Sequence, residues 1–160
     1  MILRWNMIVM NPKLTIYELM KILPERLSHL EQYIHDVDCV LIESQEASVD
    51  KIRGFSFCIG TYFHTKGYHV EWSSGGVKLR VFKGKVTWTV PKTTDKYKIR
   101  KFLAVQHTKA ILAQESEHNE SFKEYYKDLI ERENKKEKID DRCDCFLQAL
   151  YFIVNKNLKI

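Results

Sequence analysis

The sequence has no long apolar segment. None of its hydrophobic runs approaches the roughly 18 residues that a membrane-spanning helix needs. The opening residues, MILRWNMIVMNP, also lack the basic start, the extended apolar run and the small-residue cleavage site of a secretory signal. We therefore expect a soluble, intracellular protein with no membrane partner.

Cysteine is scarce, and the cysteines that are present form no recognisable pattern. They are Cys39, Cys58, Cys143 and Cys145. Their spacing matches neither a zinc finger nor a disulfide framework. Reduced thiols with a packing role are the simplest interpretation.

Internal repeats and low-complexity segments are also missing. Of the 160 residues, 44% are hydrophobic and 29% are charged, which is typical of a globular protein and not of a disordered or fibrous one. A chain of this length can bury a substantial core without disulfides or metals. We expect one domain that spans residues 1–160.

The charges are unevenly distributed, although the net charge is only +5. Between Lys78 and Lys109 lie ten Lys and Arg residues but a single acid, Asp95. Between Glu115 and Asp144 the acids outnumber the bases by eleven to seven. A basic third next to an acidic third suits a polyanion-binding surface beside a carboxylate cluster. An ordinary solvated surface has the same composition, so charge alone leaves both interpretations open.

Hydrophobic periodicity and turn residues predict an α/β fold with a mixed sheet flanked by helices. Strands are expected at residues 2–9 and 38–43, the second an almost continuous apolar run that ends at Glu43. The turn Ser73-Ser74-Gly75-Gly76 precedes a predicted β-hairpin of residues 77–82 and 85–90. The expected helices cover residues 15–35, with an interruption at Pro24, and residues 49–64, 95–114, 121–133 and 140–155.

The predicted helix at residues 49–64 contains two glycines, Gly54 and Gly60. Each costs about 1 kcal/mol relative to alanine inside a helix. Close packing against another helix, including one from a second subunit, would explain them. An ordinary core helix with two weak points explains them equally well.

Two groups of carboxylates are placed where a site can form. Glu43 ends a buried strand, and α/β sheets bind ligands outside the carboxyl ends of their strands. Asp141 and Asp144 are three residues apart at the positive start of the last helix, so they point the same way. If that helix packs beside the Glu43 strand, three carboxylates converge and need a hard cation such as Mg²⁺. Pairs of Mg²⁺ ions catalyse phosphodiester cleavage.

Each of these acids also has a simpler interpretation when it is considered alone. Glu43 is then a surface acid at a strand end. Asp140 and Asp141 are then N-caps of the last helix.

Four segments carry motifs in a definite order. KKEKIDDRCDCFLQALYFI (residues 135–153) places a basic stretch before Asp-Asp-x-x-Asp and an apolar helix. VLIESQ (40–45) is an apolar strand that ends in Glu, with Gln two residues later. IRGFSFCIGTYFH (52–64) is an aromatic helix, and KVTWTVPKTTDKYKIRKFLAV (85–105) is a strand, a loop and a Lys/Arg-rich helix. From about residue 38 to 155, this order and spacing resemble the RuvC-like Holliday junction resolvases of poxviruses and yeast mitochondria.

The resemblance implies an RNase H-like fold, a homodimer and Mg²⁺-dependent paired nicking of four-way DNA junctions, with Mn²⁺ able to replace Mg²⁺. Glu43, Asp141 and Asp144 match the family's catalytic, metal-binding acids, and Asp140 is a neighbour that assists them. The resemblance does not single out one DNA-binding residue in the basic helix. The candidates there are Lys96, Lys98, Arg100 and Lys101.

The chain departs from the family pattern in two places. The family's first acid lies in an Asp-x-Gly pattern on an opening strand, and no such pattern precedes Glu43. Residues 2–9 resemble the family's second strand instead. We therefore expect an N-terminally truncated sheet that binds Mg²⁺ weakly and cuts slowly or not at all, unless the true start lies upstream. Residues 65–84 exceed the family's short connection and are expected to insert a hairpin strand.

Three functions follow from these observations. The first is a structure-selective DNA endonuclease of recombination, repair or viral genome processing. The second is a catalytically inactive relative that binds branched DNA through the surface formed by residues 78–109. The third is a basic interaction protein without nucleic-acid chemistry. A viral protein would act in the infected cell, and a cellular one in the nucleus or the mitochondrion.

Overall fold

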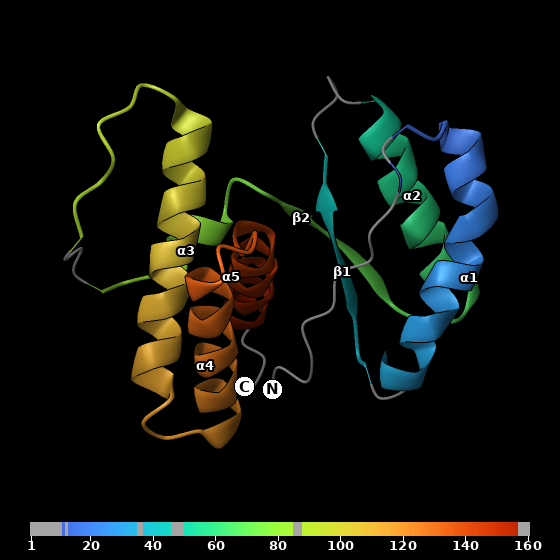
Figure 1. The fold of residues 1–160 in the computed structure, drawn as a ribbon. Coiled ribbons are helices and arrows are strands. Elements are labelled where there is room, and N and C mark those ends of the chain that lie inside the picture. The colour runs from blue at the N-terminus through green and yellow to red at the C-terminus, as the bar shows by residue number, and fades with distance from the viewer. Residues whose placement is uncertain (1–10, 12, 35–36, 46–49, 85–87, 157–160) are drawn as a thin grey trace. The chain divides into compact units, whose positions relative to one another are not determined.

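The computed structural model describes residues 11, 13–34, 37–45, 50–84 and 88–156. These residues form a mainly helical α/β structure with a two-stranded parallel sheet (Figure 1). The chain divides at Gly75–Gly76 into two compact units, here called the N-terminal unit and the C-terminal unit. No helix in the described ranges is both long and apolar enough to span a bilayer. The strand predicted at residues 2–9 lies outside the described residues.

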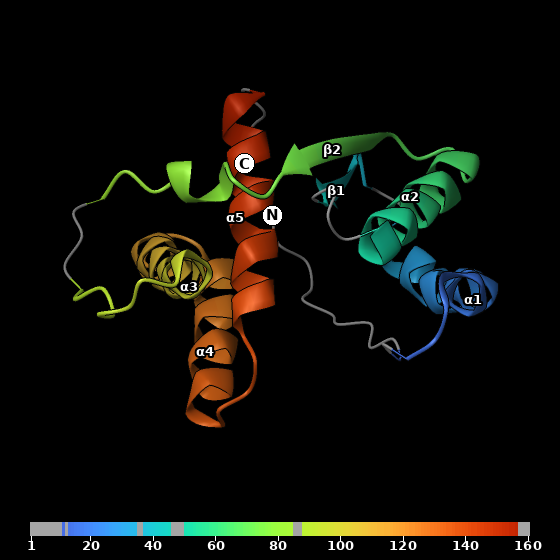
Figure 2. The same ribbon diagram turned by 90° about the horizontal axis from the view of Figure 1, so that it is seen from above.

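The N-terminal unit contains a β-α-β arrangement. Strands β1 (Val40–Ser44) and β2 (Val70–Ser74) are parallel, with Glu43 opposite Ser73. Parallel neighbours need a crossover connection, and helix α2 (Asp50–Thr65) supplies it. In both ribbon views α2 lies between this sheet and helix α1 (Ile16–Ile34) (Figures 1 and 2).

Helix α1 starts as its sequence predicts. The Thr15 N–H donates to Glu18 Oε2 at 2.7 Å, and the Glu18 N–H donates to Thr15 Oγ1 at 3.2 Å, which is a capping box. Leu23 and Leu27 are buried against Phe63 of α2. The prediction was a kink or a restart at Pro24, and the helix continues through this residue without restarting.

The C-terminal unit is built from three helices and one short 3₁₀ helix. They are η1 (Lys78–Arg80), α3 (Lys96–Glu115), α4 (Glu120–Asn134) and α5 (Asp140–Asn155). Each long helix contributes one fully buried leucine to the core, namely Leu112, Leu129 and Leu147. Helix α3 packs against both α4 and α5, so it is the central element of this unit.

The predicted hairpin is wrong for the residues that the structure describes. Residues 78–80 form η1, and neither 77–84 nor 88–90 contains a strand. Leu79 and Val81 instead pack on the core of the C-terminal unit. Burial against helices has therefore overridden the β propensity of this segment. Ser73 and Ser74, predicted as a turn, end β2, which pairs in parallel with β1 and is not part of a hairpin.

The two glycines of α2 have different surroundings. A Cβ atom at Gly60 would lie 2.8 Å from Trp72 Cζ2, so the β2 indole lies almost directly on the helix backbone. A Cβ atom at Gly54 would lie 3.8 Å from Ile16 Cδ1, an ordinary contact distance. Packing within the chain therefore accounts for Gly60, whereas Gly54 has room for a side chain.

The same substitution at the two glycines should change stability in opposite directions. Gly54→Ala should raise the free energy of unfolding by up to about 1 kcal/mol, because alanine favours the helix. Gly60→Ala should lower it, because overpacking against Trp72 costs about 1–3 kcal/mol. Urea denaturation of both variants measures the difference, and a Gly60→Ala protein more stable than the parent would contradict the described packing.

Candidate functional site

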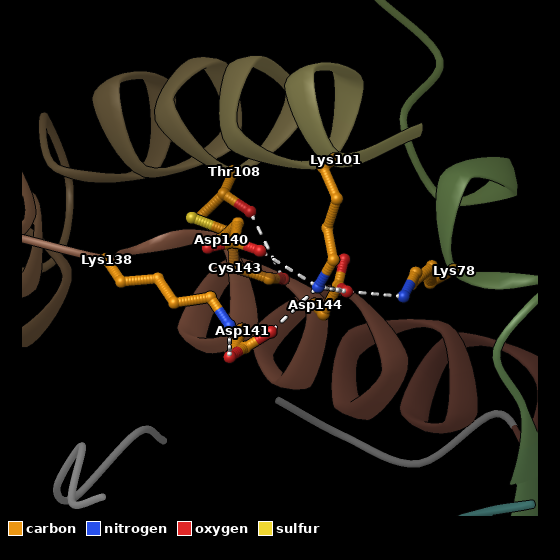
Figure 3. A network of polar contacts seen from close by, with 8 residues as sticks. All are labelled: Lys78, Lys101, Thr108, Lys138, Asp140, Asp141, Cys143 and Asp144. Carbon is orange, nitrogen blue, oxygen red and sulfur yellow. Dashed lines mark hydrogen bonds and ion pairs between the residues drawn. The ribbon is translucent and has the colours of Figure 1, made fainter. Parts of the chain in front are cut away.

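The first turns of α5 hold the aspartates that the sequence singled out. The N-cap is Ile139, which provides no side-chain cap, while Asp140 and Asp141 lie inside the first turn. The N-capping interpretation of these two acids is therefore wrong. Ile139 and Cys143 are buried in the core, and the Thr108 hydroxyl of α3 donates to the Cys143 carbonyl at 3.4 Å (Figure 3). These contacts hold the acid-bearing turn against α3.

The three aspartates converge on one ammonium group. Lys101 of α3 places its Nζ atom 2.7 Å from Asp144 Oδ2 and 2.8 Å from Asp141 Oδ1. The same nitrogen lies 3.0 Å from Asp140 Oδ2. The structure thus brings Asp141 and Asp144 together, as their three-residue spacing predicted, and places a cation between them (Figure 3).

Asp144 also contacts a second buried lysine. Lys78 Nζ of η1 lies 2.7 Å from the same Asp144 Oδ2, and the exposed fractions of the two side chains are only 10% and 8%. Lys138 Nζ, at the solvent side, lies 2.6 Å from Asp141 Oδ2. Three lysines therefore balance the three negative charges of the aspartates.

Hydrogen bonding within this cluster shifts its titration. Burial by itself would lower the pKa of Lys101, but its hydrogen bonds to three carboxylates raise that pKa well above the ordinary value. Burial would likewise raise the pKa of Asp141, but hydrogen bonds from Lys101 and Lys138 outweigh burial and lower it. Both groups are therefore charged at neutral pH.

Lys101 Nζ lies between the carboxylates at the position where a cation shared by Asp141 and Asp144 would be. Carboxylate oxygens are the ligands that Mg²⁺ prefers. Asp144 Oδ1 is buried and makes no hydrogen bond to any described residue, so one negatively charged oxygen lacks a partner. Within the described ranges, no three His, Cys, Asp or Glu side chains are arranged as a ready metal site. A metal held by Asp141 and Asp144 would therefore compete with Lys101 for their oxygens.

Glu43, the third predicted acid, belongs to the N-terminal unit. It lies at the carboxyl ends of the two parallel strands, opposite Ser73. A Cβ atom at Gly75 would overlap its carboxylate, so the side chain lies against the backbone just beyond β2. This is the end of a parallel sheet at which α/β proteins place their ligand-binding residues.

The four predicted DNA-binding residues fall into two groups. Lys96, Lys98 and Arg100 are exposed in the first turns of α3, whereas Lys101 points into the aspartate cluster. Lys78 is the site residue that the sequence argument counted as a basic charge but did not single out. In the sequence, the only feature that marks Lys78 is its place as a cationic residue between the apolar residues Val77 and Leu79.

Comparison of the chain with family models, with curated proteins and with solved structures finds no match.

The two charge-removing substitutions Asp144→Asn and Asp141→Asn should differ in their cost to stability. Asp144→Asn removes the buried carboxylate that Lys78 and Lys101 share, and breaking a buried pair costs roughly 3–5 kcal/mol. Asp141 is half-exposed, and an exposed ion pair is worth about 1 kcal/mol or less. Equal losses in the free energy of unfolding at pH 7 would contradict the described burial.

The contribution of Asp141 should also depend on pH in a defined direction. Its pKa is lower in the folded than in the unfolded protein, so its ion pairs stabilise the fold above the unfolded pKa of about 4. That stability is lost as the pH falls through the folded pKa. The difference in unfolding free energy between the parent and Asp141→Asn should therefore be largest near pH 6 and shrink towards pH 2. A difference that grows on acidification would contradict the assigned ion pairs.

Proposed function

We propose that this protein is a Holliday junction resolvase-like, Mg²⁺-dependent DNA endonuclease with an RNase H-like relationship to the RuvC-type enzymes. One observation carries the proposal: the Asp141 and Asp144 carboxylates, which match the acids of the last-helix motif, meet within 3 Å of one cationic nitrogen. A group of aspartates beside buried lysines suits phosphodiester cleavage, because this reaction needs both metal ligands and fixed positive charge.

In such a reaction, the aspartates and the lysines of the cluster would have different roles. Asp141 and Asp144, assisted by Asp140, would hold Mg²⁺, which supplies an activated water and stabilises the leaving oxygen. The ammonium groups of Lys101 and Lys78 are held by buried contacts and so need little reorganisation. Fixed cations of this kind stabilise negative charge that develops on a phosphate during the reaction.

Glu43 is the proposed third acid of the reaction. Its support is the resemblance of VLIESQ to the second-acid motif and its place at the carboxyl ends of β1 and β2. A homodimer is part of the same proposal, because paired nicks in a four-way junction require two active sites.

The exposed start of α3 suits the DNA backbone. Lys96, Lys98 and Arg100 lie within two helical turns, and the Lys98 side chain is 74% exposed. Lysine and arginine contacts to phosphates supply most of the sequence-independent affinity for DNA. Because the aspartate cluster is balanced by its own lysines, it adds little repulsion to an approaching phosphate.

The second candidate is a relative that binds branched DNA without cutting it. The observation in its favour is that Lys101 holds the carboxylate oxygens that a metal would need. In that case the cluster is a structural ion-pair network, and the exposed basic residues of the segment 78–109 provide the function.

Cleavage of a labelled four-way junction tests the first candidate. With Mg²⁺, the protein should introduce paired nicks near the branch point, slowly because the family's Asp-x-Gly acid is missing from the sequence, and leave a linear duplex of the same sequence intact. Asp141→Asn and Glu43→Gln should each abolish nicking and change junction affinity less than about threefold, because these acids hold metal and not DNA.

Asp50→Asn is the matched control, because Asp50 is also a first-turn helix acid with a basic partner three residues away. It should nick at the parental rate. Nicking by Asp141→Asn at that rate would refute the site. Tight junction binding without any nicking would favour the second candidate, and absence of both would refute the two together.

Junction affinity should depend steeply on salt through α3. The double variant Lys96→Ala/Lys98→Ala should bind more weakly and reduce the slope of log K against log salt by about 2, since each lost phosphate contact removes about 0.9. Lys127→Ala, an exposed lysine of α4, is the control and should leave the slope unchanged. Equal slopes for the double variant and the parent would exclude the start of α3 as the DNA contact.

A further inference from the structure

Lys101 takes the place of a metal ion in the aspartate cluster. Its Nζ atom lies 2.7 Å from Asp144 Oδ2, 2.8 Å from Asp141 Oδ1 and 3.0 Å from Asp140 Oδ2. One nitrogen therefore contacts three carboxylates of α5, which is the arrangement that a shared divalent cation would have (Figure 3). With Lys101 in this position, the described part of the chain offers no ready metal site.

The cluster still attracts positive charge, although three lysines neutralise it. The Asp144 side chain is only 8% exposed. Its Oδ1 atom is buried and has no hydrogen-bond partner among the described residues. Burial of a charged oxygen without a partner is unfavourable, so a cation that reached this carboxylate would be bound.

The aspartates remain held when the Lys101 ammonium group is taken away. Lys78 Nζ lies 2.7 Å from Asp144 Oδ2, and Lys138 Nζ lies 2.6 Å from Asp141 Oδ2. Three aspartates with these two lysines carry one net negative charge. A divalent cation in place of Lys101 would change the charge of the cluster from zero to one positive. An anion nearby is then needed for balance, and a DNA phosphate carries one negative charge.

The ammonium group lies beside the exposed start of α3. Lys101 Nζ is 5.7 Å from the centroid of the Tyr97 ring, one helical turn earlier, and Tyr97 is 59% exposed. Lysine carries a compact charge on a flexible four-carbon stem, so its ammonium group can move without a change in the backbone. The next residue after Tyr97 is Lys98, which belongs to the surface that is proposed to contact DNA. A phosphate bound there can compete with the aspartates for Lys101.

We propose that Lys101 blocks the metal site in the free protein and that DNA releases the block. Without DNA, the ammonium group takes the cation position and keeps divalent cations out. When DNA binds, a backbone phosphate draws the ammonium group towards Tyr97, and the aspartates can then accept Mg²⁺. This movement accompanies binding and precedes the reaction, so the ammonium group is already beside the phosphate when charge develops there.

Metal and DNA should therefore bind cooperatively, each raising the affinity of the protein for the other. The inference rests on the proposed function for the identity of the metal and of the anion. Exclusion of the metal by Lys101 is a property of the free protein and requires no cleavage.

Binding of Mn²⁺ in the absence of DNA, measured by electron paramagnetic resonance, tests the block. Lys101→Met keeps the length of the side chain without its charge. It should bind Mn²⁺ at least about tenfold more tightly than the parent, because a unit positive charge beside the site is gone. Lys101→Arg keeps the charge and should bind Mn²⁺ no more tightly than the parent.

Two further variants show whether the gained binding belongs to the cluster. Adding Asp141→Asn to Lys101→Met should remove it. Lys109→Met is the matched control, because Lys109 is another half-buried lysine of α3, with Glu133 as its carboxylate partner at 2.8 Å. It should bind Mn²⁺ as the parent does. Circular dichroism establishes that each variant is folded.

Release by DNA is tested on the parental chain without any substitution. Fe²⁺ in place of Mg²⁺, with ascorbate and peroxide, produces hydroxyl radicals that cut the backbone beside the bound metal, and mass spectrometry locates the cuts. Cuts near residues 140–144 should appear with a four-way junction and not without DNA. Cuts of equal extent in both samples would overturn the inference. This experiment decides alone if Lys101→Met does not fold.

The outcomes separate the block from the proposed function. Equal Mn²⁺ affinities of the parent and Lys101→Met would overturn the block. If the parent nevertheless nicks junctions with Mg²⁺, the proposed function stands. If Lys101→Met gains a site that needs Asp141 and DNA promotes the Fe²⁺ cuts, but the parent never nicks, the inference stands and the nuclease fails. A parent that does not bind the junction would refute both.

Discussion

The burial of Asp144 between two lysine ammonium groups is the constraint on which the C-terminal unit depends. An aspartate whose side chain is only 8% exposed must be compensated, and Lys78 and Lys101 reach it from two different elements. The Lys78–Asp144 ion pair holds η1 against α5, and the Lys101–Asp144 ion pair helps determine which face of α3 packs against α5. The position of η1 in turn determines where Val81, the next residue along the chain, packs on the core.

Sequence periodicity was sufficient for the elements whose apolar face is continuous. Residues 15–35, 49–64, 95–114, 121–133 and 140–155 were predicted as helices, and α1 to α5 lie within one or two residues of these bounds. Strand β1 was recognised because its apolar run is short and unbroken. The local sequence is enough to predict these elements, because each one buries a single face or a single run of residues.

Prediction failed where the long-range partner decides the structure. The alternating residues VKLRVF match the pattern of a hairpin strand. In the structure, Leu79 and Val81 pack on the helical core instead, and Lys78 forms an ion pair with Asp144. The acids Asp141 and Asp144 were located by their spacing on a helix, a local signal. Two of the three lysines that balance them, Lys78 and Lys101, lie 40 or more residues away along the chain, and no local pattern reveals that pairing.

The depth of Cys143 has a consequence for the chemistry that α5 can tolerate. Its side chain is fully buried, and burial raises the pKa of the thiol to about 12, so almost no thiolate exists at neutral pH. Oxidants and alkylating agents react with the thiolate and need access to it. Cys143 is therefore protected from oxidants, whereas Cys145, on the other side of Asp144 in the chain, is exposed.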